Sequence, residues 1–388
     1  MTPWFSFNRR SFRSIFRGGY SYIFGQRGQR RVHGWKLLYR LRVAVLLRSP
    51  LSIQDAAREF DRPRLWVDDE AFSRIFKLLK RAKHTVFIQM FIWKDDGIGR
   101  RMAEVLLEIA DRGVRVEVVK DSVGDLFETD RDFVTTKSSQ HSLWQRFWNH
   151  PNVKIDLESN NNHAKVFIID DRVFLLTGMN IADEYHREWH DYLVELRGRG
   201  FVEHYLTEGE MGMTSPKERL VMNSGSKREI RPVVTRLIDS AEDIIVIEHC
   251  YFSDQKVVDA LVAKTHAGVR VTVIVPAEPD LHHNANQQAI ADLLTRGDPK
   301  RLQVFLYPRI VHGKIILVDR VRAFVGSANL MTSSLDEMGE VNVLLEGETS
   351  PAILKLRRVL REDILQSKPL KTPPVLTWVK RWLAWFKL

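Results

Sequence analysis

The chain has 388 residues, of which 44% are apolar, enough for one large domain or two ordinary ones with a sizeable core. Its net charge is +10, and the single cysteine, Cys250, excludes an intramolecular disulfide framework. The basic charge is concentrated at the ends, because 1–50 contains eleven lysines and arginines, 364–388 contains five, and neither segment contains an acid. The interior, 51–363, therefore carries −6, and a basic surface is expected only at the ends.

Residues 1–50 interleave aromatic side chains with arginines. They contain no apolar run close to the roughly 18–20 residues that a membrane-spanning helix needs. A cleavable signal peptide also requires a longer apolar stretch and a small-residue cleavage site. We therefore expect no spanning helix and no secretion, and we interpret 1–50 as a basic aromatic arm that associates with a membrane.

The interior of the chain repeats itself at long period. Ala82–Asp96 matches Ala241–Gln255 at an offset of 159 residues, and Gly113–Val116 matches Gly268–Val271 at an offset of 155. The matches occur in the same order, and the shrinking offset indicates slightly longer connections in the first copy. The sequence therefore predicts two similar halves.

Each half is predicted to run from strand to helix to strand. Apolar runs bounded by a glycine turn are typical of buried, largely parallel strands, and the alternation of strands and helices indicates an α/β sandwich in each half. The predicted helices are Ile98–Arg112 and Val257–Ala267, and the strands after them are Val114–Val119 and Val269–Val275. We assign the first half to 51–205 and the second to 206–366, with the seam near 198–229.

A third match within the repeat contains the polar residues. Each half has the spacing H-x-K-x4-D, then a turn of small residues with an asparagine, and further on an acid. The first half supplies His163, Lys165, Asp170, Asn180 and Asp191, and the second supplies His312, Lys314, Asp319, Ser327, Asn329 and Glu340. The two motifs lie 149 residues apart.

The spacing of these motifs predicts where their side chains point. Residues i and i+2 of a strand face the same way, so His163 shares a face with Lys165, and His312 with Lys314. The apolar residues that follow anchor each strand in the core, and the asparagine on the next turn can return to the same strand end. Two halves related by a pseudo-twofold axis therefore place two histidines, two lysines and two asparagines around one pocket at their interface.

Such a pocket suits a phosphodiester. Lysines and asparagines donate to the non-bridging oxygens and stabilise the charge that develops there. One histidine attacks phosphorus, and the other protonates the departing oxygen. A neutral nucleophilic histidine needs its other ring nitrogen held by a carboxylate, and Asp191 and Glu340 are placed to do this for His163 and His312. We expect no metal and no other cofactor, because the protein supplies the cations.

The doubled motif carries a family resemblance. A single H-x-K-x4-D occurs by chance fairly often, but two copies, each with its asparagine and acid in a repeated context, are hard to explain as coincidence. The motifs resemble those of the phospholipase D superfamily, and the bacterial cardiolipin synthase branch matches best. The residues that carry this likeness are Gly178–Tyr185 (GMNIADEY), Trp189 and Asp191 (W-x-D), and Gly326–Leu330 (GSANL).

The resemblance covers roughly Asp55 to Asp363. It implies the phospholipase D fold, phospholipid chemistry and a phosphohistidine intermediate, with His163 as the nucleophile. Three departures bear on the acceptor: Thr177 replaces the usual glycine, Met331–Ser334 lacks the Asp and Arg often found there, and Met338 replaces a common asparagine. None of them removes a residue of the paired motifs.

The last segment, 367–388, is interpreted as an amphipathic tail. After two prolines, one helical stripe is apolar and rich in tryptophan, and the basic residues lie off it. The stripe consists of Val375, Trp378, Val379, Trp382, Trp385 and Phe386. One alternative is a helix that docks on the protein's own core. Together with the arm 1–50, the tail predicts peripheral attachment to an anionic membrane surface on the cytoplasmic side of the cell membrane.

Four functions remain to be weighed. Phosphatidyl transfer to an alcohol would give cardiolipin if phosphatidylglycerol were both donor and acceptor, and hydrolysis by the same residues would give phosphatidic acid. A nuclease should have a basic groove across its body, but this body is acidic, so no nucleic-acid partner is expected. A non-catalytic membrane scaffold conflicts with two complete motifs. Gln89 and Glu248 occupy matching positions on the first strand of each half, which the resemblance places near the pocket.

Overall fold

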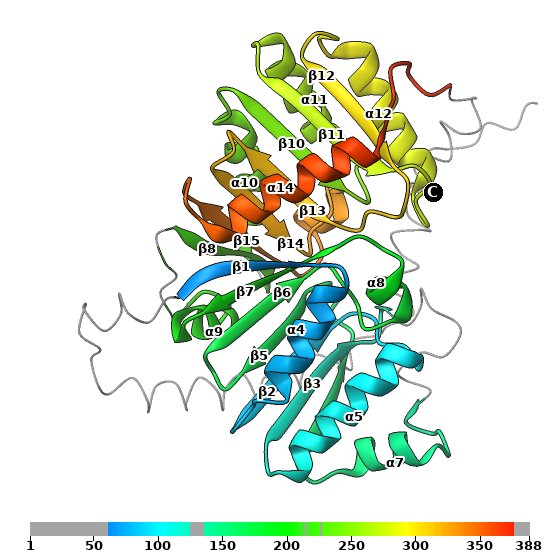
Figure 1. The fold of residues 1–388 in the computed structure, drawn as a ribbon, viewed down its shortest axis with the longest axis vertical. Helices are drawn as coiled ribbons and strands as arrows, with labels where there is room; N and C mark the ends of the chain where they lie inside the picture. Colours follow the sequence, from blue (N-terminus) through cyan, green and yellow to red (C-terminus); the bar gives the residue numbers. More distant parts are fainter. Residues whose placement is uncertain are drawn as a thin grey trace, which may run out of the picture. The chain divides into compact units, whose positions relative to one another are not determined.

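The computed structural model describes residues 61–124, 136–210, 212, 215, 217–225 and 227–375. The predicted arm 1–50 and the aromatic part of the tail beyond residue 375 lie outside the described residues. The described chain forms two β-sheets flanked by helices (Figure 1). Its first sheet uses strands up to Arg197, and its second begins at Glu218.

The two sheets have the same strand order. The first runs β1 (Asp61–Val67), β7 (Tyr192–Arg197), β6 (Val173–Thr177), β5 (Lys165–Ile169), β2 (Thr85–Met90), β3 (Arg115–Asp121) and β4 (Val153–Glu158). The second runs β16 (Lys368–Pro369), β12 (Leu302–Tyr307), β11 (Arg270–Pro276), β10 (Ile244–His249), β13 (Lys314–Val318), β14 (Arg322–Gly326), β15 (Glu340–Glu346), β8 (Glu218–Ser224) and β9 (Lys227–Arg228). Without the short edge strands β16 and β9, the second order read backwards is the first. The prediction of two related α/β halves is confirmed.

The expectation of largely parallel strands is only partly correct. Strands β2, β3 and β4 are parallel, as are β10, β11 and β12. The strands that carry the H-x-K motifs, β5 and β13, instead begin antiparallel hairpins with β6 and β14. Each hairpin turns on two residues with positive φ, Asp170 and Asp171 in the first half and Asp319 and Arg320 in the second. A two-residue turn of this kind matches the twist of the flanking strands and joins them as neighbours.

Helices cover the sheets in matching places. They are α4 (Asp69–Leu79), α5 (Gly97–Asp111), α7 (Ser142–Asn149), α8 (Asp183–Arg187) and α9 (Arg199–Leu206), then α10 (Ile230–Asp239), α11 (Gln255–His266), α12 (His283–Arg296), α13 (Thr332–Asp336) and α14 (Pro351–Gln366). The predicted helices correspond to α5 and α11. Each begins at an aspartate, Asp96 or Asp254, whose side chain accepts a hydrogen bond from a backbone N–H of the first turn. Their buried faces, including Met102 and Leu106 in α5 and Leu261 in α11, form the two helix–sheet cores.

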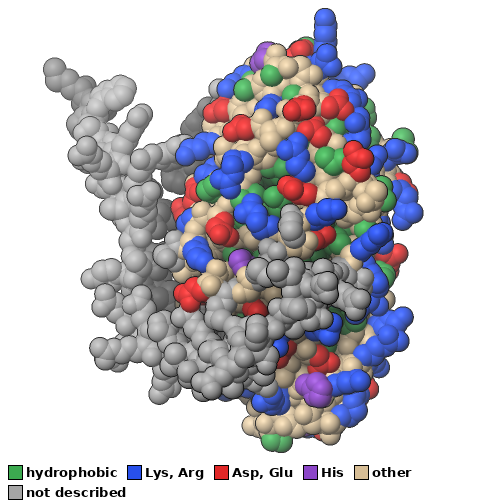
Figure 2. All heavy atoms as spheres, turned by 90° about the vertical axis from the view of Figure 1, so that its left-hand side faces the viewer, with side chains coloured by type: hydrophobic (Ala, Val, Ile, Leu, Met, Phe, Trp, Pro, Cys, Tyr) green, Lys and Arg blue, Asp and Glu red, His purple; other side chains and the backbone are tan. Residues whose placement is uncertain are grey.

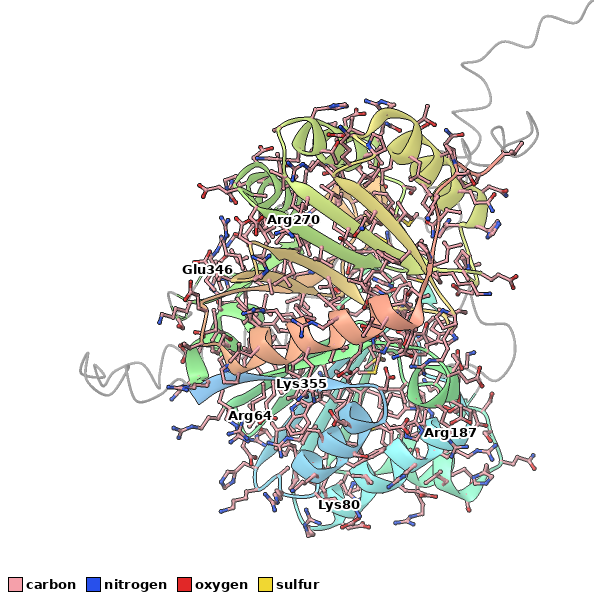
Figure 3. All side chains as sticks on the ribbon, turned by 45° about the horizontal axis from the view of Figure 1, so that its top comes forward. Arg64, Lys80, Arg187, Arg270, Glu346 and Lys355 are labelled. Atoms are coloured by element: carbon pink, nitrogen blue, oxygen red, sulfur yellow. The ribbon has the colours of Figure 1, made fainter. Side chains whose placement is uncertain are left out.

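The last helix of each half crosses to the other half. Helix α9 packs against β6 and β8, and α14 packs against β12 and β1. Figure 3 shows Lys355 of α14 beside β1. Its ammonium group forms an ion pair with Glu70 and lies 5.5 Å from the ring centroid of Trp66. These crossings join the halves along the interface that contains the motifs.

Among the described helices, none has both the length and the apolar character that a bilayer crossing requires.

Candidate active site

The two H-x-K motifs stand at the beginnings of β5 and β13. Lys165 and Lys314 are the first residues of these strands, and both are buried. Their ammonium groups turn back toward the histidines, donating to the backbone oxygen of His163 at 2.6 Å and of His312 at 2.5 Å. The strand geometry thus brings each lysine beside its own histidine, as the sequence predicts.

The backbone then brings the two halves together at the motifs. The N–H of His163 donates to the carbonyl of Gly339 at 2.7 Å, so this segment pairs with the one that enters β15. In the other half, the N–H of His312 donates to the carbonyl oxygen of His190 at 2.6 Å. The N–H of His190 in turn donates to the carbonyl oxygen of Ile310 at 2.8 Å. Each motif is therefore hydrogen-bonded to the strand that carries the acid of the other half.

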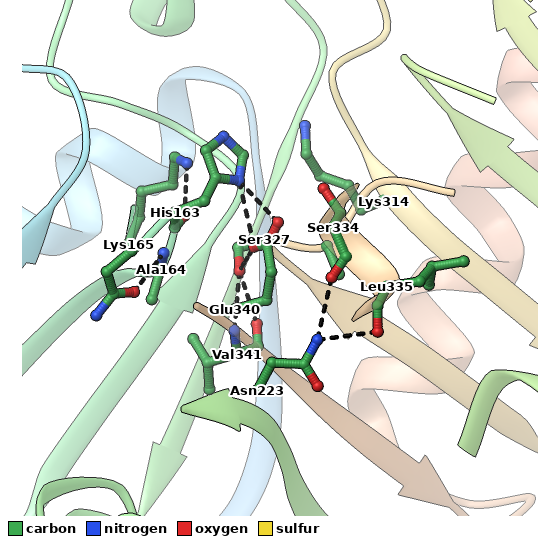
Figure 4. A network of polar contacts seen from close by, with 12 residues as sticks. His163, Ala164, Lys165, Asn223, Lys314, Ser327, Ser334, Leu335, Glu340 and Val341 are labelled. Carbon is green, nitrogen blue, oxygen red and sulfur yellow. Dashed lines mark hydrogen bonds and ion pairs between the residues drawn. The ribbon is translucent and has the colours of Figure 1, made fainter. Parts of the chain in front are cut away.

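This pairing exchanges the carboxylates between the halves. Nδ1 of His163 lies 3.1 Å from Oε1 of Glu340, and Nδ1 of His312 lies 2.7 Å from Oδ2 of Asp191. Figure 4 shows Glu340 and Ser327, both from the second half, next to His163. With Nδ1–H donating to a carboxylate, the lone pair of each ring lies on Nε2. In His312 the ammonium group of Lys314 lies 2.9 Å from this atom, so a substrate must take its place there. The expected pairing of Asp191 with His163 and of Glu340 with His312 is therefore reversed, because each acid reaches across the interface.

The two carboxylates are held differently. The hydroxyl of Ser327 donates to Glu340 at 2.5 Å, so Ser327 orients the acid. Gly178 occupies the matching position of the first half, and a Cβ there would lie 2.6 Å from Oδ2 of Asp191. Asp191 instead accepts from the backbone N–H of Tyr192 at 2.7 Å. Asp191, whose side chain is shorter than that of Glu340, therefore lies against a glycine, whereas Glu340 lies against a serine that donates to it.

Burial sets the protonation of the pocket. It lowers the pKa of His163, with help from the charge of Lys165, and together with Lys314 it lowers the pKa of His312 well below its usual value. Both rings are thus neutral near pH 7. Burial also lowers the pKa of Lys165 and Lys314 and raises that of Asp191 to about 7. An anion between the lysines would favour their charged form, so the pocket is suited to a phosphate.

The two asparagines play different parts. Oδ1 of Asn180 accepts the backbone N–H of Ile92 at 3.0 Å, which fixes the turn after β6 to the chain beyond β2. Asn329 is also buried, and its Oδ1 has no hydrogen-bond partner among the described residues. This buried acceptor is therefore the better candidate for a contact with a hydrogen-bond donor of the substrate, such as a hydroxyl group.

The aspartates of the motifs lie away from the pocket. Asp170 accepts the backbone N–H groups of Lys83, His84 and Thr85, and Asp319 accepts those of 242–244. Each sits at the far end of its strand, five residues from its lysine and so about 16 Å along the backbone. Grouping Asp170 and Asp319 with the catalytic residues is therefore wrong. They fix the hairpin turn to the start of β2 or β10.

Aromatic rings surround the histidines, a role that the sequence did not predict for them. The Phe91 ring is edge-on to His163, with centroids 4.8 Å apart. Tyr185 and Trp189 lie 5.0 and 5.3 Å from His312. Tyr185 belongs to the motif GMNIADEY and Trp189 to W-x-D, so both could have been proposed as pocket residues from the sequence. These rings desolvate the pocket and fix the orientation of the imidazoles.

Gln89 and Glu248 do not face the pocket. His249 lies directly across from Lys314 in the β10–β13 ladder, so Glu248, one residue earlier, points to the opposite face. Gln89 occupies the matching register in the first sheet. Both side chains are buried. The expectation that they lie close to the substrate is therefore wrong.

Known proteins share this sequence pattern. The family described as cardiolipin synthase, PLD-like domain, matches residues 75–211 and 234–364. Cardiolipin synthase B of Shigella flexneri is 25% identical over 346 residues, which cover 80% of this chain and 83% of that protein. Cardiolipin synthase A of Pseudomonas aeruginosa is 28% identical over 335 residues, covering 76% and 68%. Both matches extend over most of the two halves.

Solved structures share the fold. Phosphatidylserine synthase of Haemophilus influenzae superposes with a TM-score of 0.64 at 15% identity, covering 83% of this chain and 92% of that one. The polyphosphate kinase of Porphyromonas gingivalis superposes with a TM-score of 0.55 at 14% identity, covering 88% and 55%. At these identities the likeness concerns architecture alone.

Proposed function

The chain belongs to the cardiolipin synthase family of phospholipase D-like proteins, and we propose that it transfers a phosphatidyl group from one phosphatidylglycerol to another, giving cardiolipin and glycerol. The observation that carries the proposal is the exchanged pairing, in which each motif histidine is held by a carboxylate of the other half. The two histidines and two lysines are close enough that the charge of each lysine acts on the histidine of the other half as well as on its own. These residues can account both for the attack of a nucleophile on phosphorus and for the departure of the leaving group.

The first step forms a covalent intermediate. Nε2 of His163 attacks phosphorus, the P–N bond forms, and the bond from phosphorus to the glycerol oxygen breaks. The departing oxygen takes a proton from Nε2 of His312, and the ring takes this proton up from solvent when the anionic substrate binds. Lys165 and Lys314 stabilise the charge on the non-bridging oxygens. Glu340 stabilises the positive ring that His163 becomes.

The second step reverses the roles. A glycerol hydroxyl of a second phosphatidylglycerol gives its proton to His312 and attacks phosphorus. The P–N bond breaks, and His163 leaves as the neutral imidazole. Water in place of the hydroxyl would give phosphatidic acid, so hydrolysis is the alternative outcome on the same site. The aromatic rings around His312 favour the alcohol by limiting access of water.

The test is incubation of the purified chain with phosphatidylglycerol vesicles, followed by mass spectrometry of the lipids. We expect cardiolipin and glycerol in equal amounts. Phosphatidic acid without cardiolipin would establish hydrolysis instead. His163→Ala should form neither product, whereas His84→Ala, which changes an exposed histidine outside the pocket, should behave as wild type.

A nuclease remains the less favoured interpretation of these motifs. On the face drawn in Figure 2, the described lysine and arginine side chains alternate with aspartate and glutamate and form no continuous basic band. Cleavage of single- or double-stranded DNA by the purified chain at a rate above that on lipid would reverse this preference.

Attachment to a membrane is proposed for the two ends of the chain. Segments 1–50 and 367–388 contain sixteen basic residues, and each one near an anionic surface contributes roughly 1 kcal/mol. We propose that they hold the protein peripherally on the cytoplasmic side of the cell membrane. Binding to anionic vesicles should weaken but persist in high salt, and deletion of 375–388 should leave it almost wholly salt-sensitive. Unchanged binding after removal of both ends would place the contact on the body.

A further inference from the structure

A second group of ionisable side chains lies buried directly behind His312. It consists of Asp68 after β1, His190 and Tyr192 at β7, Glu248 on β10 and Asp363 on α14, and all but Asp68 are at most 3% exposed. Nδ1 of His190 lies 2.8 Å from Asp68, and its Nε2 lies 3.0 Å from the Tyr192 hydroxyl and 3.4 Å from Asp363. The proposed reaction uses none of these side chains directly.

The Tyr192 hydroxyl occupies the centre of this group. It lies 2.6 Å from Glu248 and 3.4 Å from Asp363, besides its contact with His190. These three residues are close enough together to ligate a cation. The hydroxyl, however, already lies within hydrogen-bond distance of one ligand atom of each residue, at the place that a cation would occupy. The group is therefore better described as a polar network than as a metal site.

The network touches the catalytic strand from behind. A Cβ on Gly313, between His312 and Lys314, would lie 2.7 Å from the Tyr192 ring and 2.9 Å from Glu248. The backbone of His190 also pairs with that of Ile310 and His312. A shift of these side chains would therefore move the strand that carries His312. It would also move His190, which precedes Asp191 in the chain.

Asp68 fixes the acid itself. Its carboxylate accepts the backbone N–H of Asp191 at 3.1 Å, and its own N–H donates to the Asp191 carbonyl at 3.1 Å. The same carboxylate binds His190 and Arg309. The peptide that carries Asp191 is therefore clamped between Asp68 and the segment of His312.

The matching positions behind His163 carry residues without charge. The register of the two sheets matches His190 with Gly339, Tyr192 with Val341, Glu248 with Gln89, and Gly313 with Ala164. The fold can therefore hold a motif histidine and its carboxylate without charged groups at these places. Within the described chain, the network is a feature of the His312 side, which is the side that the proposed reaction uses for proton transfer.

We propose that His190 is a positioning residue for proton transfer: as a cation it ties Asp68, Glu248 and Asp363 together across the interface and thereby holds the Asp191–His312 pair in line with the leaving oxygen. This inference rests on the proposed function. In this proposal His190 does not contact the substrate. The groups that face it are Asp68, Tyr192, Glu248, Asp363 and, stacked on its ring, Tyr307.

The charge of His190 follows from these neighbours. Burial alone would lower its pKa, but hydrogen bonds to Asp363 and Asp68 raise it well above the usual value, and Glu248 adds to this where it is ionised. Burial raises the pKa of Glu248 itself to about 8, so near pH 7 the main anionic partners of His190 are Asp68 and Asp363. The cation is therefore present at neutral pH and is lost as pH rises through the raised pKa. Proton transfer through His312 should fail over the same alkaline range.

The experiment compares two phosphatidyl donors that differ only in the leaving group. Phosphatidylglycerol needs a proton on its departing oxygen, whereas a phosphatidyl ester of p-nitrophenol does not, because p-nitrophenolate leaves as an anion. We expect His190→Gln to lower kcat on phosphatidylglycerol by roughly tenfold to a hundredfold, as expected from a small misplacement of a catalytic group. KM should change little. On the nitrophenyl ester the rate of p-nitrophenol release is measured in a single turnover with enzyme in excess, before the second step in which His312 acts as the base. This rate should stay close to wild type, and its alkaline fall in the pH profile should vanish.

Matched variants keep the test decisive. His204→Gln makes the same change at a half-buried position on α9 and should affect neither donor. If His190→Gln does not fold, Asp363→Asn removes one partner of the network without altering β7 and should show the same selectivity with a smaller loss. Equal slowing on both donors, or no slowing on phosphatidylglycerol, would overturn the proposal. Failure of the wild-type chain to act on either donor would instead refute the proposed function.

Discussion

The two halves agree in what surrounds the proposed phosphate position and differ in what stands behind it. Both present a histidine and a lysine at the start of a strand, and both receive a carboxylate from across the interface. The first histidine, however, is supported by Glu340 and Ser327 over neutral residues. The second is supported by Asp191 over the buried network of His190. The shared parts suit the binding of a phosphodiester, and under the proposed mechanism the unshared parts distinguish the nucleophile from the proton donor.

The largest test of this comparison removes each histidine in turn. His163→Ala and His312→Ala should each abolish phosphatidyl transfer while leaving thermal unfolding close to wild type. Loss of a general acid alone costs roughly 10²- to 10⁴-fold, and loss of the nucleophile should cost more. Wild-type protein quenched during turnover in alkaline denaturant should carry its phosphorus adduct on His163 by peptide mass spectrometry. An adduct on His312 would reverse the two roles, and full activity in either variant would exclude the mechanism.

Next in size is removal of the carboxylates. Asp191→Asn and Glu340→Gln should each lower kcat by roughly 10²- to 10⁴-fold, because an amide cannot hold the imidazole in the required tautomer or stabilise its positive form. Glu104→Gln is the matched control, because Glu104 is exposed on α5 and should keep wild-type kcat. A loss in one acid variant but not in the other would show that only one histidine needs its partner.

Asp191 also predicts a pH dependence of stability. Burial raises its pKa to about 7 in the folded protein, from 3.8 in the unfolded chain. The folded state therefore keeps a proton that the unfolded state has lost, and this contribution to stability falls as pH rises from about 4 to 7. Asp191→Asn lacks this change, so its stability relative to wild type should improve over that range, by at most about 4 kcal/mol. Urea unfolding at pH 5 and pH 8 measures it, and a constant difference would contradict the shift.

A smaller effect distinguishes the residues between histidine and lysine. Gly313→Ala places a methyl group against Tyr192 and Glu248 and should cost about 1–3 kcal/mol of stability. Ala164→Gly, the matched change in the first half, should cost no more than about 1 kcal/mol, through backbone entropy. Chemical denaturation of the two variants provides the comparison. Equal losses would mean that the network does not restrict the second strand.

The smallest predicted effect concerns metals. Because both halves supply their own cations, a chelator such as EDTA should leave the rate of cardiolipin formation within about twofold of the untreated protein. Inactivation that one particular divalent cation reverses would contradict a site built only from side chains.

The spacing of the motifs is sufficient to predict the pocket, because strand periodicity is local. His163 with Lys165, and His312 with Lys314, share a face wherever their strands go. The matched landmarks also predict the repeated fold and the positions of α5 and α11. The tight turns at Asp170 and Asp319 are visible in the sequence as well. Interpreted as turns rather than as catalytic acids, they predict the antiparallel hairpins that the parallel interpretation missed.

Other features depend on contacts between distant segments. The exchange of Asp191 and Glu340 is set by how the halves dock, and no periodicity within one half encodes it. Glu248 differs from Gln89 by one functional group, and its environment is defined by α14 and β7, which arrive from elsewhere in the chain. A single sequence cannot supply the geometry of such an interface, although it can identify the residues that meet there.

The exchanged pairing has a consequence for protein synthesis. His163 emerges from the ribosome well before Glu340, which follows it by 177 residues. His312 emerges after Asp191 but cannot reach it until the second sheet has formed against the first. A nascent chain that has completed only its first half therefore has a histidine without its carboxylate and no partner for proton transfer. Under the proposed mechanism, reactivity toward phosphodiesters begins only when translation has passed Glu340, and we expect a product truncated before that point to be inert toward phospholipid.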